Sequence, residues 1–180
     1  MRFVPLLSLA LAACASATPG TSTRPASETV RVFTGGVSTS IAMSGNDGVS
    51  VRKVAATPDQ VWRLLPGVLD SLGIPVNVLD AGKKTIGNSG FNVRGRLKTV
   101  PLSRYIDCGN STGIGPNADS YQVNLVFVVE VQAVDAGSSV RTTLQAMAKP
   151  VTFAQDYSAC SSKSALESRV VDILSARLKS

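Results

Sequence analysis

Two long runs of alternating apolar and polar residues constrain the fold of this chain most. From Tyr121 to Val134 nearly every second residue is apolar, and after the turn Asp135-Ala136-Gly137-Ser138 a second run continues from Val140 to Ala148. Successive side chains of a strand point to opposite faces, so each run has one apolar face for a core and one face for solvent. The short turn between the runs predicts an antiparallel hairpin whose apolar face needs a cover.

A first amphipathic helix is predicted from its start and stop signals. Thr57 is placed to cap it, Pro58 to occupy the first helical position and Gln60 to complete a capping box. Gly73 stands where a left-handed residue ends a helix. Apolar residues follow at helical spacing between these signals, namely Val61, Leu64, Leu65, Val68, Leu69 and Leu72.

A second helix is predicted near the end of the chain, from Ser164 to Leu178. Ser164 and Glu167 have the spacing of another capping box. The apolar residues at helical spacing are Leu166, Val170, Ile173, Leu174 and Leu178. This helix supplies a second apolar stripe for the sheet.

Shorter strand patterns complete the fold prediction. They cover residues 49–54, 74–79, 85 onward and 91–97, with a turn in which Gly82 is expected to supply a positive φ. The elements together predict an α+β fold, with an antiparallel sheet of about four to six strands and two helices packed on one face. We expect a single domain from 49 to 180.

The first residues are typical of a bacterial lipoprotein signal. Arg2 precedes an apolar run of about 11 residues, too short for the roughly 20 that span a bilayer, and Leu11-Ala12-Ala13-Cys14 resembles a lipobox. An ordinary signal peptide with a chance cysteine is the alternative. The lipobox predicts cleavage after residue 13, acyl chains on Cys14 and anchoring in a membrane. Ala15, which is not Asp, favours the outer membrane by resemblance to proteobacterial sorting, with the domain facing the periplasm.

The segment from 14 to 48 is predicted to be a flexible tether. Ala, Ser, Thr, Pro and Gly dominate its first half, and a possible strand from Val30 to Phe33 interrupts it. A second stretch of low order, from Met43 to Gly48, leads into the domain.

Two cysteines remain after Cys14. In an envelope compartment disulfides persist, so Cys108 and Cys160 are predicted to form one, which closes a loop worth roughly 4 kcal/mol in the chain-entropy model. Free or reactive thiols are the alternative.

The composition excludes most catalytic sites. The chain has no histidine, which removes Ser-His-Asp and Cys-His sites and histidine metal sites. Its three glutamates, Glu28, Glu130 and Glu167, are scattered, and Ser161-Ser162-Lys163 is explained more simply as a polar cluster beside a helix cap than as a Ser-Lys dyad. We expect no enzyme activity, no cofactor and no metal.

A glycine-rich segment is the candidate binding loop. It runs from Gly109 to Asn117, and its candidate residues are Gly109, Asn110, Gly113, Gly115 and Asn117. It lacks the Gly-Lys-Ser/Thr ending of a phosphate-binding loop, so a long hairpin loop is the simpler interpretation and a binding role the alternative.

The net charge of +6 is spread along the chain. Nucleic-acid-binding proteins gather Lys and Arg on one face, so we expect no nucleic acid partner. The charge favours solubility, and weak attraction to acidic headgroups or anionic partners is the alternative.

With these elements placed, residues 49–178 resemble the helix-grip domains of the BamC (NlpB) lipoproteins, accessories of the outer-membrane β-barrel assembly machine. The matching features are Cys14, the tether, Thr57-Pro58-Asp59-Gln60-Val61-Trp62, Leu72-Gly73-Ile74 leading into Asp80, and the closing helix. That family carries two such domains, whereas this chain has room for one. The resemblance implies a non-catalytic envelope lipoprotein that binds another envelope protein, in outer-membrane protein assembly. The alternative is a periplasmic carrier of a small ligand or lipid, with a cavity between helix and sheet.

Overall fold

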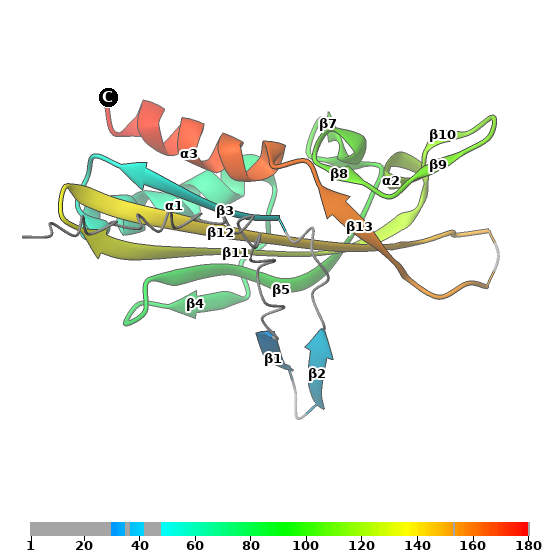
Figure 1. Cartoon of the computed structure of the whole chain (residues 1–180), viewed down its shortest axis with the longest axis horizontal. Coiled ribbons are helices and arrows are strands. Elements are labelled where there is room, and N and C mark those ends of the chain that lie inside the picture. Colours follow the sequence, from blue (N-terminus) through cyan, green and yellow to red (C-terminus); the bar gives the residue numbers. More distant parts are fainter. Residues whose placement is uncertain (1–29, 35–36, 42–47, 153, 180) are drawn as a thin grey trace, which may run out of the picture.

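The computed structural model describes residues 30–34, 37–41, 48–152 and 154–179. Its centre is a seven-stranded antiparallel sheet in the order β4-β5-β11-β12-β13-β8, with β3 also paired to β12 (Figure 1). The strands are β3 (Gly48–Val54), β4 (Val78–Asp80), β5 (Thr85–Arg94), β8 (Ile106–Asp107), β11 (Gln122–Val134), β12 (Gly137–Lys149) and β13 (Ser158–Ser162). The α+β class is as predicted, and the sheet has one strand more than the predicted upper number.

The predicted hairpin forms the middle of this sheet. β11 and β12 pair without interruption from Gln122 opposite Lys149 to Val134 opposite Gly137. Their inward residues include Phe127, Val129 and Val140, which are fully buried. The alternation therefore sets the buried face of the sheet, as the sequence predicts.

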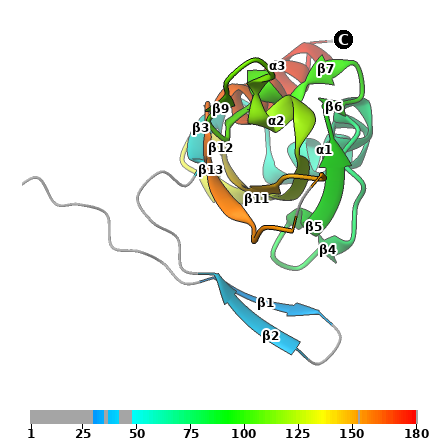
Figure 2. The same cartoon turned by 90° about the vertical axis from the view of Figure 1, so that its right-hand side faces the viewer.

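Two helices cover that face. α1 (Pro58–Leu72) and α3 (Ala165–Arg177) lie on the same side of the sheet and contact each other, and the sheet curves around them (Figure 2). Both halves of the α1 capping box are present, and Gly73 ends the helix with a φ of 78°. The apolar layer between helices and sheet is built from Val61, Leu65, Val68, Leu69, Leu166, Val170, Leu174, Ile86, Leu125 and Phe127, all fully buried.

The predicted cap of the last helix is wrong. Ser164 has a φ of 57° and its side chain makes no capping hydrogen bond. The Ser162 hydroxyl instead accepts a hydrogen bond from the Ser164 backbone N–H at 2.9 Å, and Glu167 is fully buried. The left-handed backbone at Ser164 turns the chain sharply from β13 into α3, and this turn moves both side chains away from capping positions.

Two further local predictions need correction. The positive φ of the turn before β5 belongs to Lys84, at 49°, and not to Gly82. The strand predicted over 74–79 is shorter in the structure, where β4 covers only Val78–Asp80. The predicted strands from 85 and from 91 are one strand, β5, whose register against β11 shifts between Leu125 and Phe127.

The remaining short elements gather beyond the edges of the sheet. They are β6 (Arg96–Leu97), β7 (Val100–Pro101), the 3-10 helix η1 (Leu102–Arg104), β9 (Asn110–Ser111), β10 (Gly115–Pro116) and α2 (Asn117–Ser120). They pair as two small hairpins, β6 with β7 and β9 with β10. These elements and the adjoining end of α3 frame the candidate site described below.

The segment before the domain contains a separate hairpin. β1 (Val30–Thr34) covers the strand that the sequence suggests, and it pairs with β2 (Val37–Ile41). The predicted signal peptide and Cys14 lie outside the described residues. In the part of the chain that is described, no helix has both the length and the apolar character needed to cross a membrane.

Candidate functional site

A disulfide joins two segments that are distant in the sequence. Cys108 and Cys160 are bonded, with their Cα atoms 4.4 Å apart and a sequence separation of 52. This is the pairing that the sequence predicts. It links Cys108, just after β8, to strand β13. The residues before β8 and those after β13 form the two walls of a surface cleft.

Backbone hydrogen bonds hold these two walls together next to the disulfide. β8 and β13 pair through Ser161 opposite Asp107 and Ser162 opposite Ile106. Beyond this short ladder, the Lys163 backbone N–H donates to the Tyr105 carbonyl oxygen at 2.8 Å. The Lys163 ammonium group donates to the Ser103 carbonyl oxygen, also at 2.8 Å. Lys163 therefore bonds to the residues on both sides of Arg104, and these bonds fix the seam between η1 and the start of α3.

The wall formed by η1 has its own anchors. Leu102 is fully buried in the core. The Asp119 carboxylate, in α2, accepts hydrogen bonds from the Ser103 backbone N–H at 2.8 Å and from the Ser103 hydroxyl at 2.6 Å. A buried leucine and two charge-assisted hydrogen bonds thus hold the backbone from which the side chain of the next residue, Arg104, projects.

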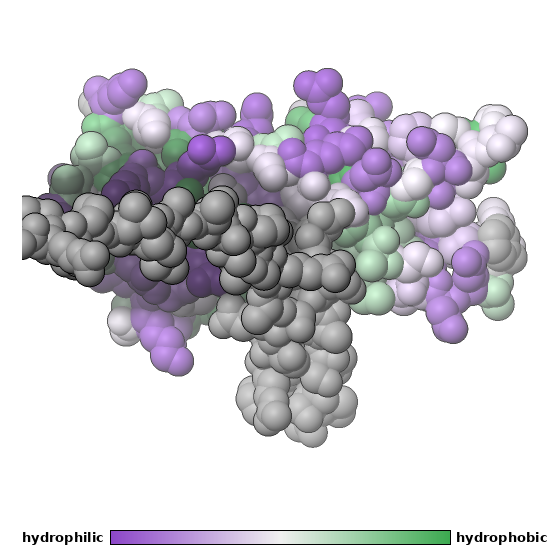
Figure 3. Space-filling view, in the orientation of Figure 1, coloured by the Kyte–Doolittle hydropathy of each residue, from purple (hydrophilic) through white to green (hydrophobic). Residues whose placement is uncertain are grey.

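The cleft between these walls has a volume of about 510 Å³. One wall comes from β7 and η1, and the other from the first two turns of α3. In the space-filling view, hydrophilic residues gather at this edge of the molecule, around β7 and beside α3 (Figure 3). The residues that line the cleft are Val100, Ser103, Arg104, Tyr105, Lys163, Ala165, Arg169 and Asp172.

The lining of the cleft is electropositive. Three of the lining residues are cationic and one, Asp172, is anionic. Lys163 is bonded to a carbonyl, as described above, but in the described part of the chain neither Arg104 nor Arg169 has a hydrogen-bond or ion-pair partner. Both arginines are exposed. Two guanidinium groups on opposite walls are therefore available to a ligand.

The predicted glycine-rich binding loop lies beside the cleft but does not line it. Gly113 and Gly115 have φ values of 79° and 89°, which let the chain form the small β9–β10 hairpin. The Asn117 side chain accepts a hydrogen bond from the Ser111 hydroxyl at 2.6 Å and donates one to the Cys108 carbonyl oxygen at 3.2 Å.

The other candidate residues of this loop do not gather around a ligand site either. The Gly109 carbonyl oxygen accepts a hydrogen bond from the Asn117 backbone N–H at 2.9 Å, and Asn110 is exposed in β9. Asn117 consequently braces the loop against the disulfide. The loop stays a candidate binding surface through its exposed tip, where Ile114 is 68% exposed.

A buried carboxyl group lies on the opposite side of α3 from the cleft. Glu167 is fully buried, its Oε1 accepts a hydrogen bond from the Ser162 hydroxyl at 2.5 Å, and its Oε2 has no hydrogen-bond partner among the described residues. Burial raises the pKa of Glu167, and the hydrogen bond from Ser162 and nearby backbone N–H groups partly oppose this.

Gly48 makes room for this pair. A Cβ on Gly48 would overlap Glu167 Oε1 and the Ser162 side chain. Along the edge of β12 the paired strand changes from β13 to β3 at Gly48. Ala146 of β12 pairs with Cys160 of β13, and Leu144 of β12 pairs with Gly48 of β3. Two strands and the start of a helix meet at this position, and only glycine fits between them.

The structure does not assemble the alternative Ser-Lys dyad. The Ser162 hydroxyl is bonded to Glu167, and the Lys163 ammonium group is bonded to the Ser103 carbonyl oxygen. Over the described ranges, no three side chains among Asp, Glu and Cys are grouped so that they could hold a metal ion.

Sequence reasoning missed the cleft. Its walls lie about 60 residues apart, and Arg104 and Arg169 belong to no recognisable motif. The spacing of Ala165, Arg169 and Asp172 along the last predicted helix was the available signal, because these positions share the helix face opposite Glu167.

Comparisons with known proteins identify no relative. The chain matches no protein-family model, no curated protein and no solved structure.

Proposed function

We propose that this chain is a non-catalytic, lipid-anchored protein of the bacterial envelope that binds another envelope protein through the cleft between η1 and α3. The observation that carries the proposal is the pair of exposed arginines, without partners among the described residues, on two walls that a disulfide fixes to each other. A surface with a fixed backbone loses little backbone conformational entropy when it binds.

The proposed location comes from the N-terminal sequence. Cleavage before Cys14 and acylation of that residue would tether the domain to the outer membrane on its periplasmic side. The disulfide fits an oxidising compartment of this kind. Intact mass of membrane-extracted protein tests the anchor: we expect a chain that starts at Cys14 and carries acyl chains, and an unlipidated chain with another start would refute it.

A role in outer-membrane protein assembly extends the proposal. It rests on the resemblance to the BamC lipoproteins and on the sheet with two covering helices. Under this proposal the domain serves as an accessory that positions a partner, without chemistry of its own.

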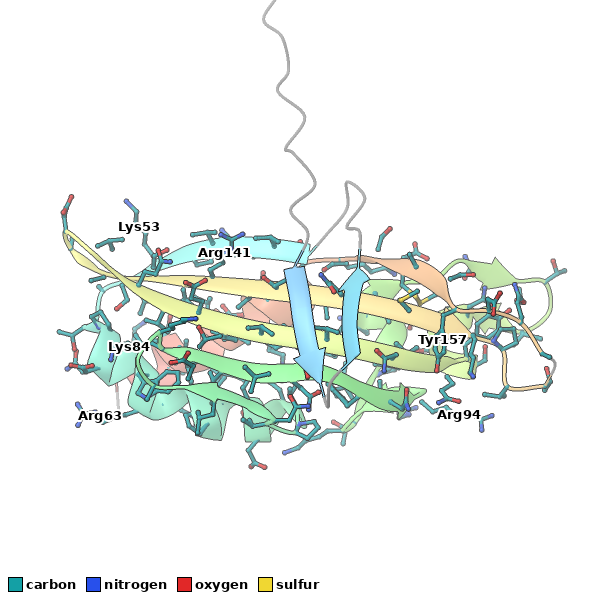
Figure 4. All side chains as sticks on the ribbon, turned by 90° about the horizontal axis from the view of Figure 1, so that it is seen from below. Lys53, Arg63, Lys84, Arg94, Arg141 and Tyr157 are labelled. Carbon is teal, nitrogen blue, oxygen red and sulfur yellow. A yellow bond between two sulfur atoms is a disulfide. The ribbon has the colours of Figure 1, made fainter. Side chains whose placement is uncertain are left out.

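Site-specific photocrosslinking tests whether the cleft contacts a partner. A benzoylphenylalanine at position 172, on the rim of the cleft, is expected to yield a discrete crosslinked band in intact cells. The control is the same crosslinker at position 63, an exposed position on α1 that lies at the far end of the molecule from the disulfide (Figure 4). Equal crosslinking at both positions, or none at position 172, would refute binding through the cleft.

The cleft also favours a second candidate, a carrier of a small anionic ligand. Its volume of about 510 Å³ lies within the roughly 300–1,000 Å³ of small-ligand pockets. The space first expected to hold such a ligand, between α1 and the sheet, is occupied by Leu65, Leu69 and Phe127, which are fully buried. Native mass spectrometry of the protein released from detergent would show a co-purified small molecule under this alternative.

A further inference from the structure

We propose that Arg104 and Arg169 together form a carboxylate-binding site, and that the partner segment taken by the cleft is an acidic peptide. This inference rests on the proposed function, because it names the chemistry of the segment that the cleft would bind. No sequence pattern pairs the two arginines, since they lie on elements that only the fold brings together.

The two arginines approach the cleft from different directions. Arg104 ends η1, whose backbone is held by Asp119, and Arg169 lies one turn after Ala165, where α3 begins. Lys163 fixes the distance between the walls through its two bonds to Tyr105 and Ser103. A ligand that reaches both guanidinium groups must therefore lie across the seam.

The chemistry of guanidinium selects the ligand. Each group presents a planar set of N–H donors that matches the two oxygens of a carboxylate, and such charge-assisted bonds are stronger than neutral ones. The lining carries three cationic side chains, Arg104, Lys163 and Arg169, and one anionic side chain, Asp172, so its formal charge is +2. Two carboxylates would balance this charge.

The shape of the lining favours a peptide over a free ion. Val100 and Ala165 are half-buried and line the cleft together with the charged groups, so part of the lining is apolar. A free ion contacts only the charges, whereas a peptide with acidic and small apolar residues also covers this apolar surface.

The test uses the full chain in detergent with its disulfide intact. A fluorescein-labelled tetraglutamate peptide is titrated with the protein and followed by fluorescence anisotropy, with tetraglutamine as the neutral probe. We expect saturable binding of tetraglutamate that weakens as salt is added, because ionic contacts are screened. No binding of tetraglutamate, or equal binding of tetraglutamine, would overturn the proposal.

A matched pair of variants locates the site. Replacing Arg104→Gln and Arg169→Gln together is expected to raise the dissociation constant at least tenfold. The control, Arg52→Gln with Arg63→Gln, removes the same charge from exposed positions outside the cleft and is expected to change it less than twofold. Circular dichroism checks that all variants fold. Equal weakening in the two double variants would show a general charge effect and overturn the site.

Two further outcomes separate this inference from the proposed function. If inorganic phosphate binds and tetraglutamate does not, the site takes a different anion and the assignment to an acidic peptide fails. If the crosslink at position 172 persists in the Arg104→Gln, Arg169→Gln chain, the cleft binds a partner by other contacts, so the proposed function stands and this inference fails. Tetraglutamate binding that depends on both arginines, without any crosslinked partner, supports the site and refutes the proposed function.

Discussion

Replacing Glu167 with glutamine should change how the stability of this protein depends on pH. The wild-type carboxyl is fully buried and only one of its oxygens has a partner among the described residues. Burial raises its pKa above the ordinary value of 4.5, so the folded protein holds the proton at pH values where the unfolded chain has released it. Glutamine has nearly the same shape, never ionises, and keeps the oxygen that accepts from Ser162.

The sign and size of the effect follow from proton linkage. Well below pH 4.5 the carboxyl is neutral in both the folded and the unfolded state, and its full contribution to stability is present. As the pH rises through the raised folded pKa, that contribution is lost, by up to about 1.4 kcal/mol for each pH unit between the two pKa values. Above the folded pKa no more is lost. The free energy of unfolding of Glu167→Gln, relative to that of the wild type, should therefore increase across this pH window.

A constant offset does not hide this trend. The amide introduced by Glu167→Gln would place N–H donors where Oε2 now has no partner, at a cost of about 1–3 kcal/mol that is the same at every pH. The prediction concerns only how the difference in unfolding free energy between variant and wild type changes with pH, so this constant offset cancels.

Urea unfolding between pH 4 and pH 8, followed by Trp62 fluorescence, measures the difference directly. Trp62 is the only tryptophan and packs against the core, so its emission reports global unfolding. Glu130→Gln is the control, since it removes a carboxyl from the other face of the sheet. Parallel wild-type and Glu167→Gln curves, or a variant that loses stability relative to the wild type as the pH rises, would refute the reasoning.

Three other changes test the local structure. Gly48→Ala should cost about 1–3 kcal/mol, because the new Cβ overlaps the Ser162 side chain; urea unfolding measures it, and a neutral result would contradict the close approach. Thr57→Ala should cost about 1 kcal/mol through loss of the α1 capping box, whereas Thr57→Ser should retain most of it in the same assay. Cys108→Ser combined with Cys160→Ser should lower the free energy of unfolding by about 4 kcal/mol for a 52-residue loop, and a thermal midpoint equal to that of the wild type would count against a stabilising disulfide.

Local sequence signals predict most of the elements because they act over a few residues. The α1 helix is the clearest case, since Thr57, Pro58, Gln60 and Gly73 specify both of its ends. The same reasoning fails at Ser164, where the spacing of a capping box is present but the backbone enters the left-handed region. The turn from β13 into α3 is set by the pairing of β13 with β8, which a local pattern does not contain.

The candidate site is predicted only in part. The Cys108–Cys160 pair could be predicted because just two cysteines remain once Cys14 is assigned to the predicted lipobox. The glycine-rich loop beside it attracts attention for its composition, yet Asn117 uses its side chain to brace the loop. The cleft itself is not predicted, because helical spacing places Arg169 on one face with Ala165 and Asp172 but no local pattern pairs that face with Arg104.

The sequence by itself determined which faces of the main strands and helices turn to the core, and which class of fold they build. Periods of two and 3.6 residues decide which side chains share a face, and burial of those faces is the main favourable term in folding. The tertiary structure alone decided which polar groups meet. Glu167 lies against Gly48 and Ser162, and the two cleft arginines face one seam, because strand order and the path of each connection bring them together. These are contacts between distant parts of the chain, and no local periodicity encodes them.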